Sequence, residues 1–325
     1  MKAAVVRQWG GPERLGVEPV PDPVPRAGEV VVELRARSVN RRDVILRQRG
    51  CGLELPKILG MDGAGMRCDT GEEVVIYPCL NWGDNRAGPG SHFAIVGDAT
   101  DGTYAELVAV PESVLYPKPP KLSWEEAAAL PCAALTAYRA LFTRARVMAG
   151  ETVLVLGAGG DVSTFAVMFA AAADAEVYVT SSSPSKIRAV QKIGAKGGVL
   201  HTDPDWPQQV RELTSGGADV IISGSGSMVT GALDCVKVGG RIAVFGPCGG
   251  RMAMINVPAL FLGQVSILGS NLGSPDDFGE MLVFVRRNDI RPVIDRVYPL
   301  SEISRAHSYF ESQVRVGKVV VTTPA

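Results

Sequence analysis

The sequence predicts an α/β protein in which a doubly wound parallel sheet forms one domain, inserted into a second domain rich in β-strands. Two observations support this fold class. In the middle of the chain, short apolar runs alternate with helical patterns, and such alternation is typical of a parallel sheet with helices on both faces. The first third instead has strand patterns separated by proline and glycine, and mixed character returns near the end.

Size and composition narrow the class further. The chain has 325 residues, which suits two domains better than one core. Its 33 basic and 34 acidic residues nearly cancel and no basic block is present, so nothing indicates a nucleic-acid partner. No apolar run reaches the roughly 18 residues of a membrane span, and the N-terminus lacks the apolar stretch of a secretory signal. We therefore expect a cytoplasmic protein with no membrane contact.

The β-rich part is assigned from short runs of branched and apolar residues. These runs predict strands over residues 2–6, 29–39, 72–78 and 102–111. Four prolines between positions 19 and 25 exclude a helix there. Residues 81–100 are polar and glycine-rich without periodicity, which predicts a long loop. Loops of this length are usually functional, mobile or relics of something larger.

The predicted parallel-sheet domain follows a helix start, because Ser123 with Glu126 three residues later forms a capping-box pattern. Beyond it, the pattern predicts strands over 152–156, 176–180, 217–226 and 239–247, and helices over 162–175, 183–195 and 228–236. The tail adds a strand at 266–271, a helix around 276–288 and a final strand over 317–323.

A glycine-rich turn joins the first of these strands to the first helix. The sequence GAGGDVS at 157–163 follows TVLVL directly and precedes a helical pattern, which is the context that a dinucleotide-binding loop requires. Glycine lets the backbone approach a pyrophosphate, and the helix N-terminus adds free N–H groups and a partial positive charge. A glycine triad alone is weak evidence, but the flanking strand and helix make the motif specific.

The end of the second strand selects the nucleotide. Enzymes that use NAD usually place an acidic residue there to bind the ribose hydroxyls, whereas residues 177–186 include four serines and Lys186 but no acid. Hydroxyls and an ammonium suit a 2′-phosphate. We therefore predict NADP as cofactor, with Ser181, Ser182 and Lys186 as phosphate contacts. The alternative is that the serines only start a helix, with Ser183 as its cap.

Cysteines and histidines show no metal-binding pattern. The six cysteines form no C-x-x-C pair, and none stands beside a histidine at ligand spacing. A cytosolic chain of this size needs no disulfide, so free and mostly buried thiols are expected. His92, His201 and His307 lie far apart in the sequence, and each alone is expected to be structural.

Together, the motifs resemble the medium-chain dehydrogenase/reductase superfamily, and within it the quinone-oxidoreductase and zinc-alcohol-dehydrogenase-like proteins. The matching segments include SVNRRDVILRQRG, PKILGMDGAG, DGTYAELVAVP, EEAAALPCAALTAYRAL, VKVGGRIAVFG and GKVVV. The resemblance implies a GroES-like catalytic domain over residues 1–118, completed by 263–325. It places an NADP-binding Rossmann domain over 119–262.

The resemblance also implies the cofactor contacts. The loop aligns with the quinone-reductase form, in which Gly157, Gly160 and Ser163 take the small-residue positions. Asp161 departs from the glycine that members usually carry, and a carboxylate beside a pyrophosphate would repel it unless it points to solvent. The remaining expected contacts are Thr136, Phe245, Gly246, Ser270, Asn271 and Lys318. Lys318 is expected to reach the cofactor phosphates, and the alternative is a solvated lysine.

Zinc members of the superfamily hold the catalytic metal at three motif positions, which here are Asn40, Met61 and Cys132. An amide and a thioether are poor zinc ligands. Asp62 and Cys132 offer two usable groups where zinc catalysis needs three protein ligands. The loop at 81–100 lacks the closely spaced cysteines of the structural-zinc lobe and is interpreted as its remnant. We therefore expect no metal.

Zinc-free members reduce acceptors that carry their own electron sink, and for these the enzyme mainly supplies positioning. The predicted activity is NADPH-dependent hydride transfer to a small quinone or α,β-unsaturated carbonyl in a homodimer or homotetramer. Asn40 and Asp62 are the candidate catalytic residues. Asn40 could contact substrate or nicotinamide, or stabilise a turn; Asp62 could orient Asn40 or a water, or cap the turn. Asp43 is expected to be structural, and solvent to supply the proton.

Two other functions stay open. One is a zinc alcohol dehydrogenase that uses Asp62, Cys132 and His92 as atypical ligands. The other is a dinucleotide-binding sensor without chemistry, which Asp161 and the missing proton donor would favour.

Overall fold

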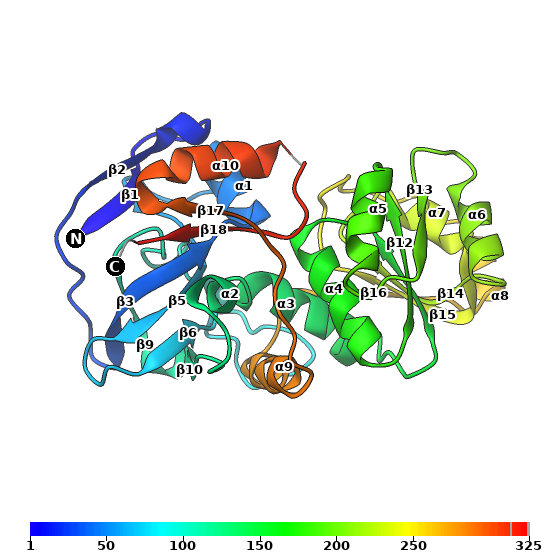
Figure 1. Cartoon of the computed structure of the whole chain (residues 1–325), viewed down its shortest axis with the longest axis horizontal. Helices are drawn as coiled ribbons and strands as arrows, with labels where there is room; N and C mark the ends of the chain where they lie inside the picture. Colours follow the sequence, from blue (N-terminus) through cyan, green and yellow to red (C-terminus); the bar gives the residue numbers. More distant parts are fainter. Residues whose placement is uncertain (313, 324–325) are drawn as a thin grey trace. The chain divides into compact units, whose positions relative to one another are not determined.

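The computed structural model describes residues 1–312 and 314–323, and Figure 1 shows its helices and strands. Contacts divide the chain into two units, one formed by residues 1–133 with those from 274 onward and the other by residues 134–273. These divisions fall later in the chain than the expected domain limits after residues 118 and 262, which stay a prediction. No helix in the described ranges is long and apolar enough to cross a membrane.

The first unit is built mainly from strands. Its largest sheet has the order β10-β6-β5-β3-β18-β17, and β9 also pairs with β3. The strands are β3 (Glu29–Ser38), β5 (Asp62–Arg67), β6 (Glu73–Ile76), β9 (Leu107–Pro111), β10 (Leu115–Pro117), β17 (Ile294–Pro299) and β18 (Lys318–Thr322). Smaller sheets have the orders β2-β1-β4 and β7-β8, from β1 (Lys2–Val6), β2 (Leu15–Pro19), β4 (Lys57–Ile58), β7 (Cys79–Leu80) and β8 (Ala94–Ile95).

The first unit contains the helices α1 (Arg41–Arg49), α2 (Trp124–Ala128), α9 (Pro275–Arg287) and α10 (Ile303–Glu311), with short turns at Pro12–Arg14, Glu112–Val114 and Leu300–Glu302. Three of these four helices, α1, α2 and α9, begin at a capping box. The predicted capping box is confirmed, since Ser123 Oγ accepts the N–H of Glu126 at 3.2 Å and the Glu126 carboxylate accepts that of Ser123 at 2.8 Å. Ser274 and Asp277 form the same box at α9.

Strand β3 positions the polar residues discussed below. It runs antiparallel to β5, with Ser38 opposite Asp62, and antiparallel to β18, with Ser38 opposite Val320. Glycine at position 65 permits the close approach of β5, because a Cβ there would lie 2.0 Å from the carbonyl oxygen of Glu33. The end of β3 is therefore flanked by the first residues of β5 and β18.

The second unit contains a six-stranded parallel sheet of order β13-β12-β11-β14-β15-β16. Its strands are β11 (Thr152–Leu156), β12 (Glu176–Ser181), β13 (Gly197–Leu200), β14 (Ala218–Ser223), β15 (Val236–Val244) and β16 (Ser266–Gly269). Its helices are α4 (Asp161–Ala172), α5 (Pro184–Gln191), α6 (Trp206–Leu213), α7 (Val229–Leu233) and α8 (Val257–Leu262), with a π-helical stretch Arg139–Arg144; α3 (Pro131–Tyr138) spans the division. Counted from β11, the order is that of a doubly wound Rossmann sheet, which confirms the predicted fold class.

Burial explains why this sheet forms. All five residues of β11 are buried, as expected for a strand covered on both faces. Several elements differ from the sequence expectation. The helix expected over 228–236 is shortened to α7, the strand expected from residue 102 starts at Leu107, and helices α1, α6, α8 and α10 were not foreseen. The cysteines are free as expected, but Cys51, Cys68 and Cys248 are exposed, so the thiols are not mostly buried.

Candidate functional site

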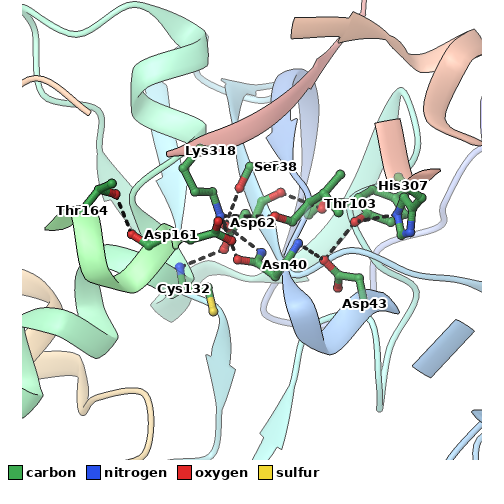
Figure 2. Close-up of polar contacts among 12 residues, drawn as sticks. Ser38, Asn40, Asp43, Asp62, Thr103, Cys132, Asp161, Thr164, His307 and Lys318 are labelled. Atoms are coloured by element: carbon green, nitrogen blue, oxygen red, sulfur yellow. Dashed lines mark hydrogen bonds and ion pairs between the residues drawn. The ribbon is translucent and has the colours of Figure 1, made fainter. Parts of the chain in front are cut away.

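The end of β3 and the starts of β5 and β18 meet in one buried polar cluster (Figure 2). Asp62 Oδ2 accepts hydrogen bonds from Ser38 Oγ at 2.5 Å and from Asn40 Nδ2 at 2.8 Å. Its Oδ1 accepts the backbone N–H of Cys132 at 2.8 Å. Asp62 is wholly buried, so these donors replace the water that a carboxylate otherwise requires.

Lys318 completes the cluster with its ammonium. Its Nζ lies 2.8 Å from Asn40 Oδ1, 3.2 Å from Asp62 Oδ2 and 3.4 Å from the carbonyl oxygen of Val39. The Lys318 and Asp62 side chains are both 0% exposed, and buried charges persist when they are paired and hydrogen-bonded. From the resemblance, Lys318 is expected at the cofactor phosphates, but in the structure its ammonium contacts Val39, Asn40 and Asp62. Asn40, Asp62 and Lys318 are thus the predicted residues that the fold brings together.

A second chain of buried polar groups leads away from Asn40, which is the N-cap of α1. The Asn40 N–H donates to Asp43 Oδ2 at 2.8 Å, and the Tyr104 hydroxyl lies 2.9 Å from the same oxygen. Tyr104 also lies 3.2 Å from His307 Nε2. Burial raises the pKa of Asp43 to about 7 and lowers the pKa of His307 to about 3. These groups hold the start of α1, and with it the Asn40 backbone.

Two of the three motif positions of the metal site, Asn40 and Met61, do not offer zinc ligands. Both ends of the Asn40 amide are engaged, and Met61 is a buried thioether. Both Asp62 oxygens are engaged, because Oδ2 accepts hydrogen bonds from Ser38, Asn40 and Lys318 and Oδ1 accepts one from the backbone N–H of Cys132. Over residues 1–312 and 314–323, no group of three His, Cys, Asp or Glu side chains could hold a metal ion.

The loop interpreted as a remnant of the structural-zinc lobe is held by packing and charge. Between β7 and β8, Trp82 is buried and its ring meets Phe93 edge-on at 5.6 Å. Arg86 Nε lies 2.7 Å from Asp276 at the start of α9. His92, a ligand in the alternative zinc site, is exposed. The loop thus has its own anchors within the first unit.

In the second unit, the turn between β11 and α4 has the backbone of a phosphate cradle. Gly157 and Gly159 have φ angles of +83° and +91°, which residues with a side chain rarely adopt. A Cβ at Gly157 would meet no atom within 4 Å, so space is open beside the backbone. Gly160 is the N-cap of α4, Asp161 is its first residue and Ser163 is buried in its first turn. This turn fits the pyrophosphate of a dinucleotide.

The expected 2′-phosphate contacts lie at the end of β12 and in α5. Ser181 is buried, Ser182 is exposed and Lys186 is partly buried. His201, which the sequence analysis expects to be structural, lies beside them: its backbone N–H donates to the Ser181 carbonyl at 3.0 Å and its Nδ1 lies 3.3 Å from Thr180 Oγ1. Its place follows from the parallel pairing of β12 with β13, which no local motif signals.

The other expected cofactor contacts follow strands of the parallel sheet or lie on α3. Phe245 and Gly246 come after β15, and Ser270 and Asn271 come after β16. Within the described part of the chain, Ser270 Oγ is buried without a hydrogen-bond partner, and such a group calls for a ligand or water. Thr136 is buried on α3. The fit to a dinucleotide therefore rests on an open glycine turn and an unsatisfied hydroxyl.

Comparisons with known proteins agree with this architecture. Residues 26–120 match the alcohol dehydrogenase GroES-like domain, and residues 162–287 match the zinc-binding dehydrogenase family. The chain is 35% identical to a zinc-type alcohol dehydrogenase-like protein of Schizosaccharomyces pombe, with 90% of each chain covered. It is 29% identical to a quinone oxidoreductase of Mus musculus, with 99% of this chain and 97% of the relative covered.

Solved structures are also similar. The crystal structure of an NAD-dependent alcohol dehydrogenase has a TM-score of 0.94 and 37% identity to this chain, with 100% of both chains covered. The sequence identity, the two family matches and the doubly wound sheet lead to one conclusion: the chain belongs to the medium-chain dehydrogenase/reductase superfamily of oxidoreductases.

Proposed function

We propose that the protein is an NADPH-dependent, zinc-independent reductase of quinones or α,β-unsaturated carbonyls. The observation that carries the proposal is the cluster of Asn40, Asp62 and Lys318. Asn40 stands at one of the three positions where zinc members hold their metal, and hydrogen bonds of 2.8 to 3.2 Å join it, Asp62 and Lys318 to one another. Without a bound cation, nothing in this cluster lowers the pKa of an alcohol, whereas an electron-poor acceptor needs no such help.

The proposed reaction assigns separate tasks to the residues. The bound dinucleotide would supply the hydride. A quinone takes up this hydride and one proton to give a hydroquinone, and an enone takes the hydride at its β-carbon and the proton at its α-carbon. Asn40 is 3% exposed while Asp62 and Lys318 are fully buried, so the amide of Asn40 is the group of the cluster proposed to contact the acceptor oxygen. Solvent supplies the proton.

NADPH is proposed over NADH because of the residues after β12. Ser181, Ser182 and Lys186 offer two hydroxyls and an ammonium, and no acid is present to bind ribose hydroxyls. Ser183 occupies the N-cap position of α5, but its side chain makes no cap hydrogen bond. This weakens the alternative in which the serines only begin the helix. The similar alcohol dehydrogenase structure is NAD-dependent, so the preference needs a direct test.

A zinc-dependent alcohol dehydrogenase is the second candidate function, because the S. pombe relative is named zinc-type alcohol dehydrogenase-like. Elemental analysis of the purified protein, together with NADPH and NADH consumption against quinones, enones and simple alcohols, separates the two functions. The proposal expects less than stoichiometric zinc and turnover with electron-poor acceptors. One tightly held zinc per chain with alcohol oxidation would overturn it, and cofactor binding without any turnover would favour a sensor.

A homo-oligomer is also proposed. Strand β16 is the last in the order of the parallel sheet, and no further strand pairs with it within the described residues. Ile267 on this strand is exposed, as are Val257, Phe261 and Leu262 of α8. An open strand edge flanked by apolar side chains suits a second copy of the same chain, which would extend the sheet.

The cytoplasmic location of the protein stays a prediction from its composition.

A further inference from the structure

We propose that Lys318 is a positioning residue for hydride transfer, whose buried ammonium fixes the orientation of the Asn40 amide and occupies the seat of a metal cation. The inference deepens the proposed function and rests on it. In this inference, the positive charge that a bound metal ion would supply comes from the Lys318 ammonium.

The ammonium is fully used by the cluster. An ammonium has three N–H donors, and three oxygens lie within 3.4 Å of Nζ: Asn40 Oδ1, Asp62 Oδ2 and the carbonyl oxygen of Val39. Two of these oxygens belong to the segment that joins β3 to α1. Lys318 therefore ties this segment to the first residue of β5.

This arrangement permits one orientation of the Asn40 amide. Its Oδ1 faces the ammonium of Lys318 at 2.8 Å, and its Nδ2 faces the carboxylate of Asp62 at 2.8 Å. Rotating the amide by half a turn would set NH₂ against an ammonium and C=O against a carboxylate, so both contacts would become repulsive. The second N–H of Nδ2 is then the amide group left for an acceptor oxygen. An ammonium on Oδ1 also polarises the amide and strengthens that N–H as a donor.

The same geometry explains why a divalent cation has no place here. The Asp62 carboxylate is already neutralised by an ammonium 3.2 Å away, and its oxygens accept hydrogen bonds on both sides. A metal ion that bound Asp62 Oδ2 or Asn40 Oδ1 would have to displace the Lys318 ammonium from these oxygens. The positive charge in this site is therefore supplied by the chain itself.

Lys318→Ala tests the inference, because it removes the ammonium and leaves space for a small added amine. With NADPH and a quinone or enone that the wild type reduces, kcat should fall about tenfold or more while the dissociation constant for NADPH, measured by fluorescence, stays within about twofold. Added methylammonium should restore part of kcat and raise the melting temperature of the variant, whereas tetramethylammonium at equal ionic strength should do neither. Lys121→Met, at an exposed lysine, controls for loss of charge.

The outcomes are distinguishable. Loss of NADPH affinity with kcat intact at saturation would make Lys318 a phosphate contact and overturn the inference, as would a loss of kcat that methylammonium does not restore. Wild-type protein without turnover would instead refute the proposed function. If Lys318→Ala does not fold, the Asp62→Asn/Lys318→Met variant removes both charges together. Unchanged kcat in that folded variant would also overturn the inference.

Discussion

Asp43 and His307 share one hydroxyl, since the Tyr104 oxygen lies 2.9 Å from Asp43 Oδ2 and 3.2 Å from His307 Nε2. Burial favours the uncharged form of both residues: the pKa of Asp43 is raised from 3.8 to about 7, and that of His307 is lowered from 6.5 to about 3. Near pH 5 the folded chain therefore holds a proton on Asp43, and the unfolded chain holds one on His307. Near pH 5 the pair therefore carries one proton in each state, and folding causes no net proton uptake by Asp43 and His307 together.

Removing one partner should expose the pH dependence of the other. In Asp43→Asn, His307 stays neutral when folded but gains a proton when unfolded below about pH 6.5, so the free energy of unfolding should rise with pH. The expected change relative to the wild type is roughly 1 kcal/mol per pH unit between about pH 4 and 6.5. Urea unfolding at several pH values in this window measures the slope.

His307→Phe is the matched control with the opposite sign. The folded variant keeps a proton on Asp43 that the unfolded chain releases above about pH 3.8, so its unfolding free energy, relative to the wild type, should fall as pH rises toward 7. If both variants give curves parallel to the wild type, the assignment of a protonated Asp43 and a neutral His307 is wrong.

Asp161 should weaken dinucleotide binding and stabilise the helix that it begins. It is the first residue of α4, directly after the glycine turn. A carboxylate there interacts favourably with the helix dipole by about 0.3 to 1 kcal/mol, but it repels a pyrophosphate at the same turn. Asp161→Asn should therefore tighten NADPH binding by about two- to tenfold and lower the melting temperature slightly.

Fluorescence titration at low and high salt measures this effect, which should shrink as salt screens the repulsion. Asp174→Asn, at an exposed turn after α4, is the charge-matched control and should change neither quantity. Unchanged affinity in Asp161→Asn would mean that the carboxylate points away from the phosphates.

Nucleotide preference should reside in Ser182 and Lys186. Lys186→Met removes the ammonium proposed for the 2′-phosphate and should weaken NADPH binding about tenfold while leaving NADH binding nearly unchanged. Ser182→Asp should shift preference further toward NADH, because the carboxylate repels the 2′-phosphate and can bind the ribose hydroxyls. The dissociation constants of NADPH and NADH, measured for the wild type and both variants, test this assignment. An equal loss of affinity for NADPH and NADH would contradict it.

The sequence was sufficient for features that are local and insufficient for contacts that are not. The glycine turn, the Ser123 capping box and the parallel sheet each follow from neighbouring residues, and the structure contains all three. Helix α6 is absent from the sequence prediction although Trp206, Val210 and Leu213 have helical spacing. Its Pro207 lies in the first turn, where proline is tolerated.

The candidate site shows the same limit. Asn40 and Asp62 were identifiable from the motifs that resemble a metal site. The partner of both, Lys318, lies 278 positions from Asn40 in the sequence, and the two meet because β18 pairs with β3. A lysine in GKVVV fits a phosphate contact or a solvated surface equally well from sequence alone. Its burial beside Asp62 depends on sheet pairing that no local pattern specifies.

The exposed edge of the parallel sheet should be where two copies of the chain associate. Lysine at an edge strand opposes pairing with another strand, so Ile267→Lys should convert the proposed homo-oligomer to a smaller species, and Leu262→Glu on α8 should do the same. Light scattering coupled to gel filtration measures the mass. Val283→Glu is the control, since this exposed apolar residue lies on α9 in the other unit. A wild-type monomer, or an oligomer that survives both edge variants, would place the interface elsewhere or exclude it.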